Sequence, residues 1–168
     1  IGENIAKGLE ANGISHVVVL SSFGAHLSEG SGVVNGLYDF EQRLKTIPDL
    51  NVLSLRAGFF LQNFYANLPL VQTQGILGGF PIAADIKIPM IHTTDIGEVA
   101  AQYMQSLNFS GFSVQQLAGA NDYTMADAAG IIGDALNMDN LPYVPFEYED
   151  AKQGMMEMGM SESLADAY

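Results

Sequence analysis

The sequence contains no cysteine, and only 6 of its 168 residues are lysine or arginine. The first absence excludes disulfide bonds, thiolate nucleophiles and cysteine-based metal sites, and it favours a reducing, cytoplasmic compartment. The scarcity of basic residues, set against 19 acidic ones and a net charge of −13, argues against nucleic acids and anionic membranes as partners, because both are bound through basic clusters. No apolar run approaches the ~20 residues of a membrane-spanning helix, and no signal peptide is recognisable.

Motifs that mark hydrolases and zinc enzymes are also missing. The sequence contains neither GxSxG nor HExxH, and His16, His26 and His92 lack the spacing of metal ligands. His16 is better explained as the first residue of a strand. We therefore expect no metal site and no Ser-His-Asp triad.

The charged residues are few and unevenly distributed. They make up 15% of the sequence, against the ~25% usual in globular proteins. Residues 1–121 carry 9 acidic and 5 basic side chains, whereas residues 122–168 carry 10 acidic and 1 basic. No linker rich in Pro, Gly or Ser separates the two parts. We therefore expect a main part, residues 1–121, and an acidic C-terminal segment, residues 122–168, integrated with the same domain.

Hydrophobic periodicity in the first third of the chain predicts a βαβ unit. Apolar residues at helical spacing predict a helix over 1–9, ended by Gly13, and another over 37–47. Short apolar runs predict strands over 16–20 and 51–56. A strand, a helix and a second strand in this order should form parallel strands joined by a right-handed crossover.

The rest of the chain continues to alternate between helices and strands, which predicts a layered α/β fold. Pro69 should break one of the helices, Thr94 and Asp95 should cap another, and Thr124 should be the N-cap of a third. The elements expected from these patterns are helices over 61–74, 94–107 and 124–136 and extended segments over 113–117 and 143–148.

Polar and aromatic residues follow the two strands of the predicted βαβ unit. Ser21 and Ser22 come after the first strand, and the segment 57–60, Ala-Gly-Phe-Phe, comes after the second. Ligands of open α/β sheets bind beyond the carboxyl ends of the strands. Many loops between a strand and a helix contain serine or glycine simply for turn formation, so both interpretations stay open.

Two motifs of dinucleotide enzymes occur in the wrong context. The glycine-rich segment 30–36 lies too far beyond the first strand for a pyrophosphate-binding turn, and Asp49 precedes its strand instead of ending it. Tyr148 and Lys152 have the Tyr-x-x-x-Lys spacing of short-chain dehydrogenases, but they lie in the acidic C-terminal segment. A flexible loop and a coincidence are the better explanations.

The C-terminal segment is rich in methionine. Met155, Met156, Met158 and Met160 fall within six residues. Methionine repacks easily around varied partners, so a binding surface is one interpretation. Packing of a C-terminal helix onto the rest of the domain is the other, and both hold if this helix covers a ligand cleft.

Taken in order, five segments resemble the latter part of an NmrA-like, atypical short-chain dehydrogenase. They are VVVLSSFGAH, GLYDFEQRL, VLSLRAGFFLQNF, IHTTDIGEVAAQYM and EYEDAKQGMMEMGMSESLADAY. The resemblance implies a partial Rossmann-like, doubly wound parallel sheet with a small C-terminal substrate subdomain. It also implies that NADP or NAD lies across the sheet and that a small molecule is the substrate.

The resemblance assigns roles to individual residues. Glu41 and Asp95 match a glutamate of the connecting helix and the aspartate of the family's DIG motif, and Ala57 replaces a proline of the family. The residues implied to bind the cofactor are Ser21, Ser22, Phe23, Arg56, Ala57, Gly58 and Phe59. The residues implied to line the substrate cleft are Phe60, Asn63 and Met155.

Catalytic groups match the family less well. Tyr38 is the candidate proton donor, but Gln42 occupies the position at which Tyr-x-x-x-Lys requires lysine, and Leu37 stands where many relatives have lysine. Without that cation nothing evident lowers the pKa of a tyrosine from its usual value of ~10. This argues against alcohol dehydrogenation but permits hydride transfer to a quinone, for which solvent can supply the proton.

We therefore expect an NAD(P)H-dependent oxidoreductase that reduces a quinone or a similar carbonyl or aromatic compound. The alternative is a non-catalytic regulator that senses the redox state of NAD(P) and binds a protein partner. No glycine-rich turn for the pyrophosphate is present, so we expect a fragment that about four strands should precede. The low charged fraction agrees with a surface covered by that missing part or, in a homo-oligomer, by a second copy.

Overall fold

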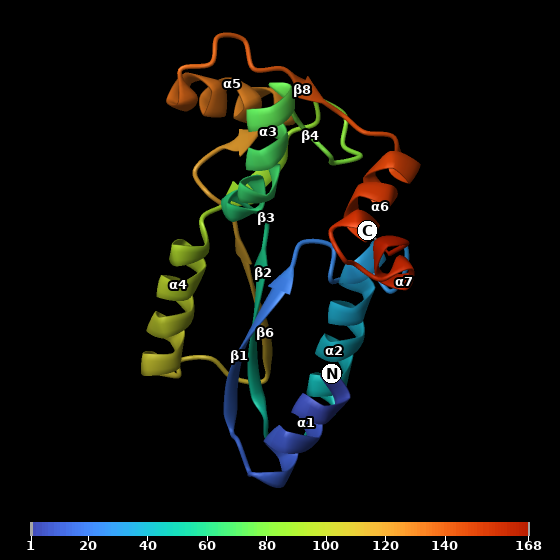
Figure 1. Ribbon diagram of the computed structural model, residues 1–168. Helices are drawn as coiled ribbons and strands as arrows, with labels where there is room; N and C mark the ends of the chain where they lie inside the picture. The colour runs from blue at the N-terminus through green and yellow to red at the C-terminus, as the bar shows by residue number, and fades with distance from the viewer. Residues whose placement is uncertain (1, 168) are drawn as a thin grey trace. The chain divides into compact units, whose positions relative to one another are not determined.

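The computed structural model describes residues 2–167, which divide into two compact units (Figure 1). Unit 1 is the chain up to Gly58 together with Ile91–Ala118, and unit 2 is Phe59–Met90 together with the chain from Gly119 onward. The chain passes between the units three times, and the third crossing, between Ala118 and Gly119, lies three residues before the boundary expected at 121. The expected division differs in one respect, because residues 59–90, assigned to the main part, pack with the C-terminal segment.

Unit 1 is built on a parallel sheet of three strands in the order β1-β2-β6, namely β1 (His16–Ser22), β2 (Asn51–Ala57) and β6 (Phe112–Leu117). The register places Ser22 opposite Ala57, and Ala57 opposite Leu117, so the three strands end at the same edge. The parallel pairing of β1 and β2 confirms the α/β fold expected from the alternation of apolar runs and amphipathic helices.

Helices cover both faces of this sheet. Helices α1 (Gly2–Ala11) and α2 (Asn35–Lys45) lie on one face and α4 (Thr93–Ser106) lies on the other (Figure 1). A 3₁₀ turn, η1 (Gly32–Val34), precedes α2. The core beneath α1 and α2 consists of Ala6, Val19, Leu44, Ile47, Leu50 and Val52. Each large aliphatic side chain buried in this way contributes about 1.5–3 kcal/mol, which holds the two helices on the sheet.

The start of α4 differs from the expectation. His92, in an extended conformation, is the N-cap, and its Nδ1 accepts a hydrogen bond from the Thr94 amide at 3.2 Å. The prediction that Thr94 and Asp95 cap this helix is therefore wrong by two residues. Sequence reasoning favours Thr and Asp at this position because they are the usual caps, whereas an imidazole nitrogen can accept the same bond.

Unit 2 consists of short elements. Strands β3 (Phe59–Phe60), β5 (Ile88–Ile91) and β7 (Asp122–Tyr123) form one small sheet, and β4 (Leu77–Gly78) pairs in parallel with β8 (Tyr143–Val144). The helices are η2 (Leu61–Asn67, 3₁₀), α3 (Leu68–Gln74), α5 (Met125–Leu136), α6 (Tyr148–Glu157) and α7 (Glu162–Ala165). None of the helices within residues 2–167 is long and apolar enough to cross a membrane.

One apolar core explains why residues 59–90 belong to unit 2. The buried side chains of that segment pack with those of α5 and the loop after it. The core consists of Phe64, Val71, Leu77, Met90, Met125, Ala128, Ala129 and Leu141. Because the contributing segments are short, their apolar surface is buried only when they pack together.

Two local predictions for unit 2 have different outcomes. The N-cap prediction for α5 is confirmed, since Thr124 Oγ1 accepts from the Asp127 amide and Asp127 Oδ2 accepts from the Thr124 amide, both at 2.9 Å. Pro69 does not break a helix. It lies in the first turn of α3, where its missing N–H is not needed, and the chain before α3 is a 3₁₀ helix.

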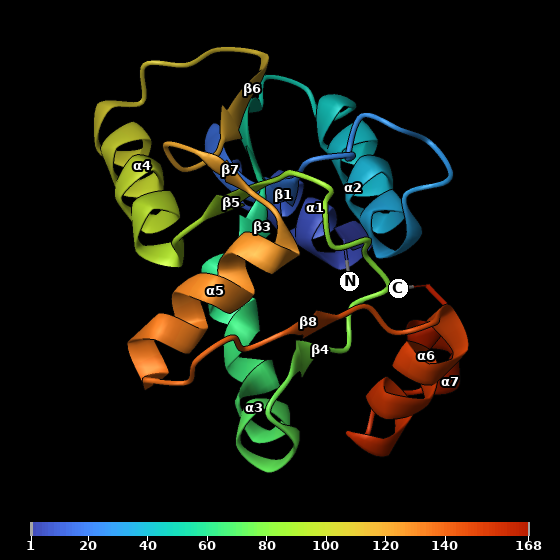
Figure 2. The same cartoon turned by 90° about the horizontal axis from the view of Figure 1, so that it is seen from above.

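The Tyr-x-x-x-Lys spacing in α6 has a structural explanation. The Tyr148 hydroxyl donates to the main-chain carbonyl of Asp166 at 2.9 Å, and Lys152 Nζ lies 2.5 Å from Asp166 Oδ1 and 3.6 Å from Glu162 Oε1. Both side chains therefore attach α7 to α6, and the two helices lie side by side when unit 2 is seen from above (Figure 2). Asp166 raises the pKa of Lys152 through its hydrogen bond, so the ammonium stays charged.

Candidate functional site

The residues expected to bind a cofactor meet at the carboxyl edge of the sheet in unit 1. Ser21 lies opposite Arg56, and Ser22 lies opposite Ala57. The Phe23 amide, just beyond β1, donates to the Ala57 carbonyl at 3.0 Å. A backbone hydrogen bond therefore connects the chain just after β1 to the last residue of β2.

The third strand ends at the same edge. The Gly58 amide donates to the carbonyl of Leu117, the last residue of β6, at 2.9 Å. Open α/β sheets bind their ligands beyond this edge. The predicted cofactor-binding residues that the structure brings together in unit 1 are Ser21, Ser22, Phe23, Arg56, Ala57 and Gly58.

The loop that follows β1 is tightly held. Gly24 has a φ of 86°, a left-handed conformation that favours glycine, and Ala25 is completely buried. The Gly24 carbonyl accepts from Ser31 Oγ at 3.4 Å, and the Ala25 carbonyl accepts from Arg56 Nη2 at 3.5 Å. Ala25 therefore faces the interior of unit 1, and Ser31 and Arg56 each make one long contact with the backbone of the loop.

A buried carboxylate lies directly behind this edge. Glu41 of α2 is 1% exposed, and its Oε1 accepts from Ser21 Oγ at 2.7 Å and from Ser54 Oγ at 2.6 Å. Arg56 forms a bidentate ion pair with the same carboxylate, in which Nε donates to Oε1 at 3.1 Å and Nη2 donates to Oε2 at 2.6 Å. We call these four side chains, Ser21, Glu41, Ser54 and Arg56, the Glu41 network.

Hydrogen bonding decides the charge of Glu41. Burial raises the pKa of its carboxyl group, but the hydrogen bonds from Arg56, Ser54 and Ser21 outweigh burial and leave the pKa below its ordinary value. The group is therefore a carboxylate at neutral pH. With four donors already directed at it, it has no role as a proton donor.

The network also limits what two of the predicted residues can offer a ligand. Arg56 is 12% exposed at its side chain and its guanidinium is neutralised by Glu41, so it is not a free cation for a phosphate. Ser21 is buried and its hydroxyl donates to the same carboxylate. Ser22 and Phe23 are half-buried and lie outside the network, at the end of β1. Of the predicted cofactor-binding residues in unit 1, Ser22, Phe23, Ala57 and Gly58 lie outside the network, and Ala57 is buried.

Sequence reasoning did not find the network. The family resemblance marked Glu41 only as a matching residue, and no pattern singled out Ser54. A signal was present, because Glu41 lies three residues before Leu44 on the buried face of α2, where an acidic residue needs a partner. A serine within the apolar run of β2 is the second half of that signal.

Tyr38, the candidate proton donor, is half-buried on α2, one turn before Glu41. The lysine that would lower a tyrosine pKa is absent from position 42, and Gln42 accepts instead from Lys45 Nζ at 3.3 Å. Lys45 Nζ also lies 4.4 Å from the centre of the Phe112 ring. The one lysine of α2 is therefore engaged at the far end of the helix.

The remaining predicted residues belong to unit 2. The Phe59 ring packs against Phe64 at 5.3 Å and Phe80 at 5.5 Å between ring centres, as part of the aromatic side of the core. Phe60 is half-buried after it, Asn63 is exposed on η2, and Met155 is half-buried on α6. Phe59 therefore contributes mainly to packing, and the structure records no interaction that joins Phe60, Asn63 and Met155 to one another.

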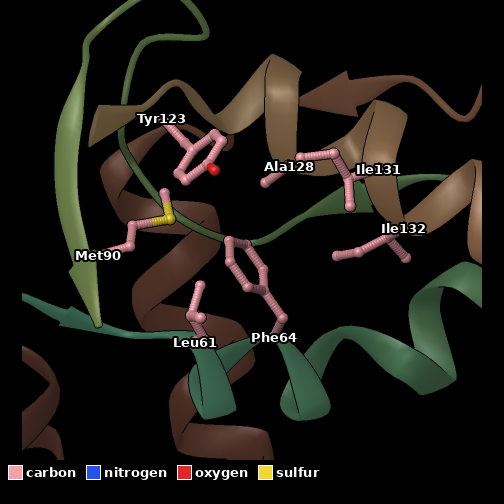
Figure 3. Close-up of a pocket in the computed structure, with 7 residues that line it drawn as sticks. All are labelled: Leu61, Phe64, Met90, Tyr123, Ala128, Ile131 and Ile132. Atoms are coloured by element: carbon pink, nitrogen blue, oxygen red, sulfur yellow. The ribbon is translucent and has the colours of Figure 1, made fainter. Parts of the chain in front are cut away.

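Unit 2 contains an apolar pocket of about 220 Å³ between η2, β5, β7 and α5 (Figure 3). For comparison, a closed apolar cavity of roughly 150 Å³ holds one benzene ring. The residues that line it are Leu61, Phe64, Met90, Tyr123, Ala128, Ile131 and Ile132, none of which was predicted to line the substrate cleft. Within residues 2–167 no three His, Asp or Glu side chains are grouped as a metal site would require.

Comparisons with known proteins agree with this architecture. No family model matches the chain. An NAD(P)H azoreductase from Xenophilus azovorans is 27% identical over 157 residues, which are 92% of this chain and 52% of the azoreductase. An NADPH-dependent quinone oxidoreductase from Escherichia coli has a similar structure, with a TM-score of 0.81 over 99% of this chain and 58% of its own, at 20% identity. The fold is Rossmann-like.

A second solved structure supports the same conclusion. A triphenylmethane reductase from a Citrobacter species has a TM-score of 0.76 over 98% of this chain and 56% of its own, at 16% identity. The chain spans about half the length of the azoreductase and of both structural neighbours. At these identities the structural likeness establishes the fold, and the carboxyl edge of the sheet is where ligands bind in that fold.

Proposed function

We propose that this chain is the later part of an NAD(P)H-dependent oxidoreductase of the NmrA-like type, which reduces a quinone, an azo compound or a similarly conjugated small molecule. The observation that carries the proposal is the carboxyl edge of unit 1, where the ends of three parallel strands converge on Ser22, Phe23 and Gly58. The names of the similar proteins agree with it, since they comprise an NAD(P)H azoreductase and a quinone oxidoreductase solved with NADPH.

The residues at this edge fit a nicotinamide cofactor. Ser22 has a hydroxyl that is not used by the Glu41 network, and Gly58 has no side chain to separate a flat ring from the backbone. Ser22 and Phe23 would hold the ring at the end of β1, and Gly58 would hold it just beyond β2, with Arg56 and Ala57 behind them. When bound, such a cofactor supplies a hydride. The residues of this chain would orient the ring and exclude water from one side of it.

No proton relay is needed for this class of substrate. Glu41 is saturated by its donors, and Tyr38 lacks a lysine partner. A quinone or an azo group takes up hydride at one atom, and its other atom can be protonated by water. This is why we propose a conjugated acceptor instead of an alcohol or a sugar. Phe60, Asn63 and Met155 remain our candidates for contact with that acceptor.

The same observation also supports a second candidate, a non-catalytic sensor of the NAD(P) redox state. A sensor needs the binding edge but not a proton donor, and Tyr38 is poorly suited as a donor because Gln42 stands in the place of lysine. The two candidates differ in turnover and not in cofactor binding.

One experiment separates them, using the full-length protein. NADPH oxidation is followed with a panel of quinones and azo dyes, and the affinities for NADPH and NADP⁺ are measured by calorimetry. Turnover with any acceptor supports the oxidoreductase. Tight binding of both cofactor forms without turnover supports the sensor, and absence of binding refutes both.

A pair of matched variants tests the position of the site. Ser22→Val places an apolar branched side chain at the edge and should weaken NADPH binding at least tenfold, about 1.4 kcal/mol. Ser28→Val makes the same change at an exposed position of the following loop and should leave binding unchanged. Equal effects of the two substitutions would contradict a site at the end of β1.

A further inference from the structure

We infer that Glu41 is a positioning residue: through Ser21 and Arg56 it fixes the end of β1 and the loop that follows, so that Ser22 and Phe23 are held ready for the cofactor. This inference rests on the proposed function. Glu41 itself lies on α2, buried behind the edge, and its hydrogen-bond partners are Ser21, Ser54 and Arg56. It therefore acts on Ser22 and Phe23 only through their neighbours.

The face of the sheet that α2 covers changes character along the strands. In β1 the residues at alternate positions are Val17, Val19 and Ser21, and in β2 they are Val52, Ser54 and Arg56. The valines belong to or pack against the core beneath the helices, whereas the polar residues converge on Glu41. The polar part of this face is therefore at the carboxyl edge, where the cofactor is proposed to bind.

Stability alone does not account for a charge at this position. A buried ion pair usually contributes no more than well-packed apolar residues of similar volume, because desolvation offsets the attraction. Leu44, one turn further along the same face of α2, is packed in exactly such an apolar environment and is completely buried. The carboxylate of Glu41 accepts four hydrogen bonds, which fix the positions of the Ser21, Ser54 and Arg56 side chains. An apolar side chain at position 41 could fill the same space but could not fix these positions.

The network reaches the loop at two places. Ser21, which precedes Ser22 in the chain, is anchored to Glu41 at 2.7 Å. Arg56, held by both carboxylate oxygens, directs Nη2 toward the Ala25 carbonyl at 3.5 Å. One carboxylate thus restrains the residues on both sides of Ser22 and Phe23, which are the residues proposed to contact the cofactor.

The test uses three variants of the full-length protein. Glu41→Gln keeps the shape of the side chain and removes its charge. Ser54→Ala removes one donor, leaves the ion pair in place and is the milder variant if Glu41→Gln folds poorly. Glu3→Gln is the matched control, because Glu3 is an exposed acid that also pairs with an arginine, Arg43 at 3.2 Å.

Two readouts are compared for each variant: the dissociation constant for NADPH, and the amide hydrogen exchange of residues 22–27 relative to that of α4. Because Glu41→Gln removes the charge that holds Ser21 and Arg56 in place, it should raise the dissociation constant for NADPH about tenfold or more. Exchange in 22–27 should accelerate by a similar factor, while exchange in α4 changes less. Ser54→Ala should act in the same direction by a smaller factor, and Glu3→Gln should change neither quantity.

The outcomes distinguish the positioning role from a purely structural one. If exchange in 22–27 and in α4 rises together, and NADPH affinity is unchanged once the folded fraction is taken into account, Glu41 only stabilises the fold and the inference is overturned. If the wild-type protein binds no dinucleotide, the proposed function fails and the cofactor part of the inference fails with it. In that case the exchange measurements still decide whether Glu41 holds the loop.

Discussion

Lowering the pH should destabilise unit 1 through Glu41, and the substitution Glu41→Gln should remove this contribution to the pH dependence. The pKa of this carboxyl group is lowered in the folded chain, so its protonation is less favourable there than in the unfolded chain, where the pKa is about 4.3. The stability that Glu41 contributes is therefore fully present above about pH 4.3 and is lost as the pH falls through the lower, folded value.

The size of the effect follows from the burial of the ion pair. Glu41→Gln leaves Arg56 without its counter-ion at a side chain that is only 12% exposed. Breaking a buried ion pair costs about 3–5 kcal/mol, and the residual exposure of Arg56 places this case near the lower value, about 3 kcal/mol. The difference between wild type and variant should be largest near neutral pH and should shrink as the pH falls through the lowered pKa of Glu41 and the group becomes protonated in the wild type.

The assay is urea unfolding of the full-length protein, followed by far-ultraviolet circular dichroism at several pH values. Wild type, Glu41→Gln and the exposed control Glu3→Gln are compared under the same conditions. Parallel stability profiles for wild type and Glu41→Gln would refute the reasoning, and so would a Glu41→Gln protein as stable as wild type at pH 7. Either result would mean that the carboxylate is not ionised and paired as the geometry indicates.

Three further predictions concern unit 2. Thr124→Ala removes the capping box of α5 and should lower the free energy of unfolding, measured with urea, by about 1 kcal/mol. Ser161→Ala, at an N-cap whose side chain makes no capping bond, should leave it almost unchanged, and equal losses would contradict the prediction. Gly133→Ala should lower the free energy of unfolding, because a Cβ there would lie 2.9 Å from a neighbouring side chain, whereas Gly130→Ala, with open space around it, should raise it by up to about 1 kcal/mol. The opposite order of stabilities would contradict the close packing at Gly133. Lys152→Met should accelerate hydrogen exchange in α7 relative to α5, and unchanged exchange would show that the contact with Asp166 holds nothing in place.

Much of the fold could be predicted from local patterns. The apolar runs at 16–20 and 51–56 lie within β1 and β2, and the N-cap at Thr124 is where the sequence places it. These features depend on residues that are close together in the sequence, so they can be predicted from the sequence alone. The grouping of residues 59–90 with the C-terminal segment could not be predicted in this way, because a core of short segments is recognisable only after they pack.

The candidate site divides along the same line. By itself the sequence determined which residues follow the parallel strands, because strand order and the βαβ rule bring Ser22 and Gly58 to one edge. Only the tertiary structure decided that Arg56 is committed to Glu41 and that Ser21 faces inward. The physical reason is that a buried carboxylate requires several donors at once, and these come from α2, β1 and β2, segments whose proximity is set by packing.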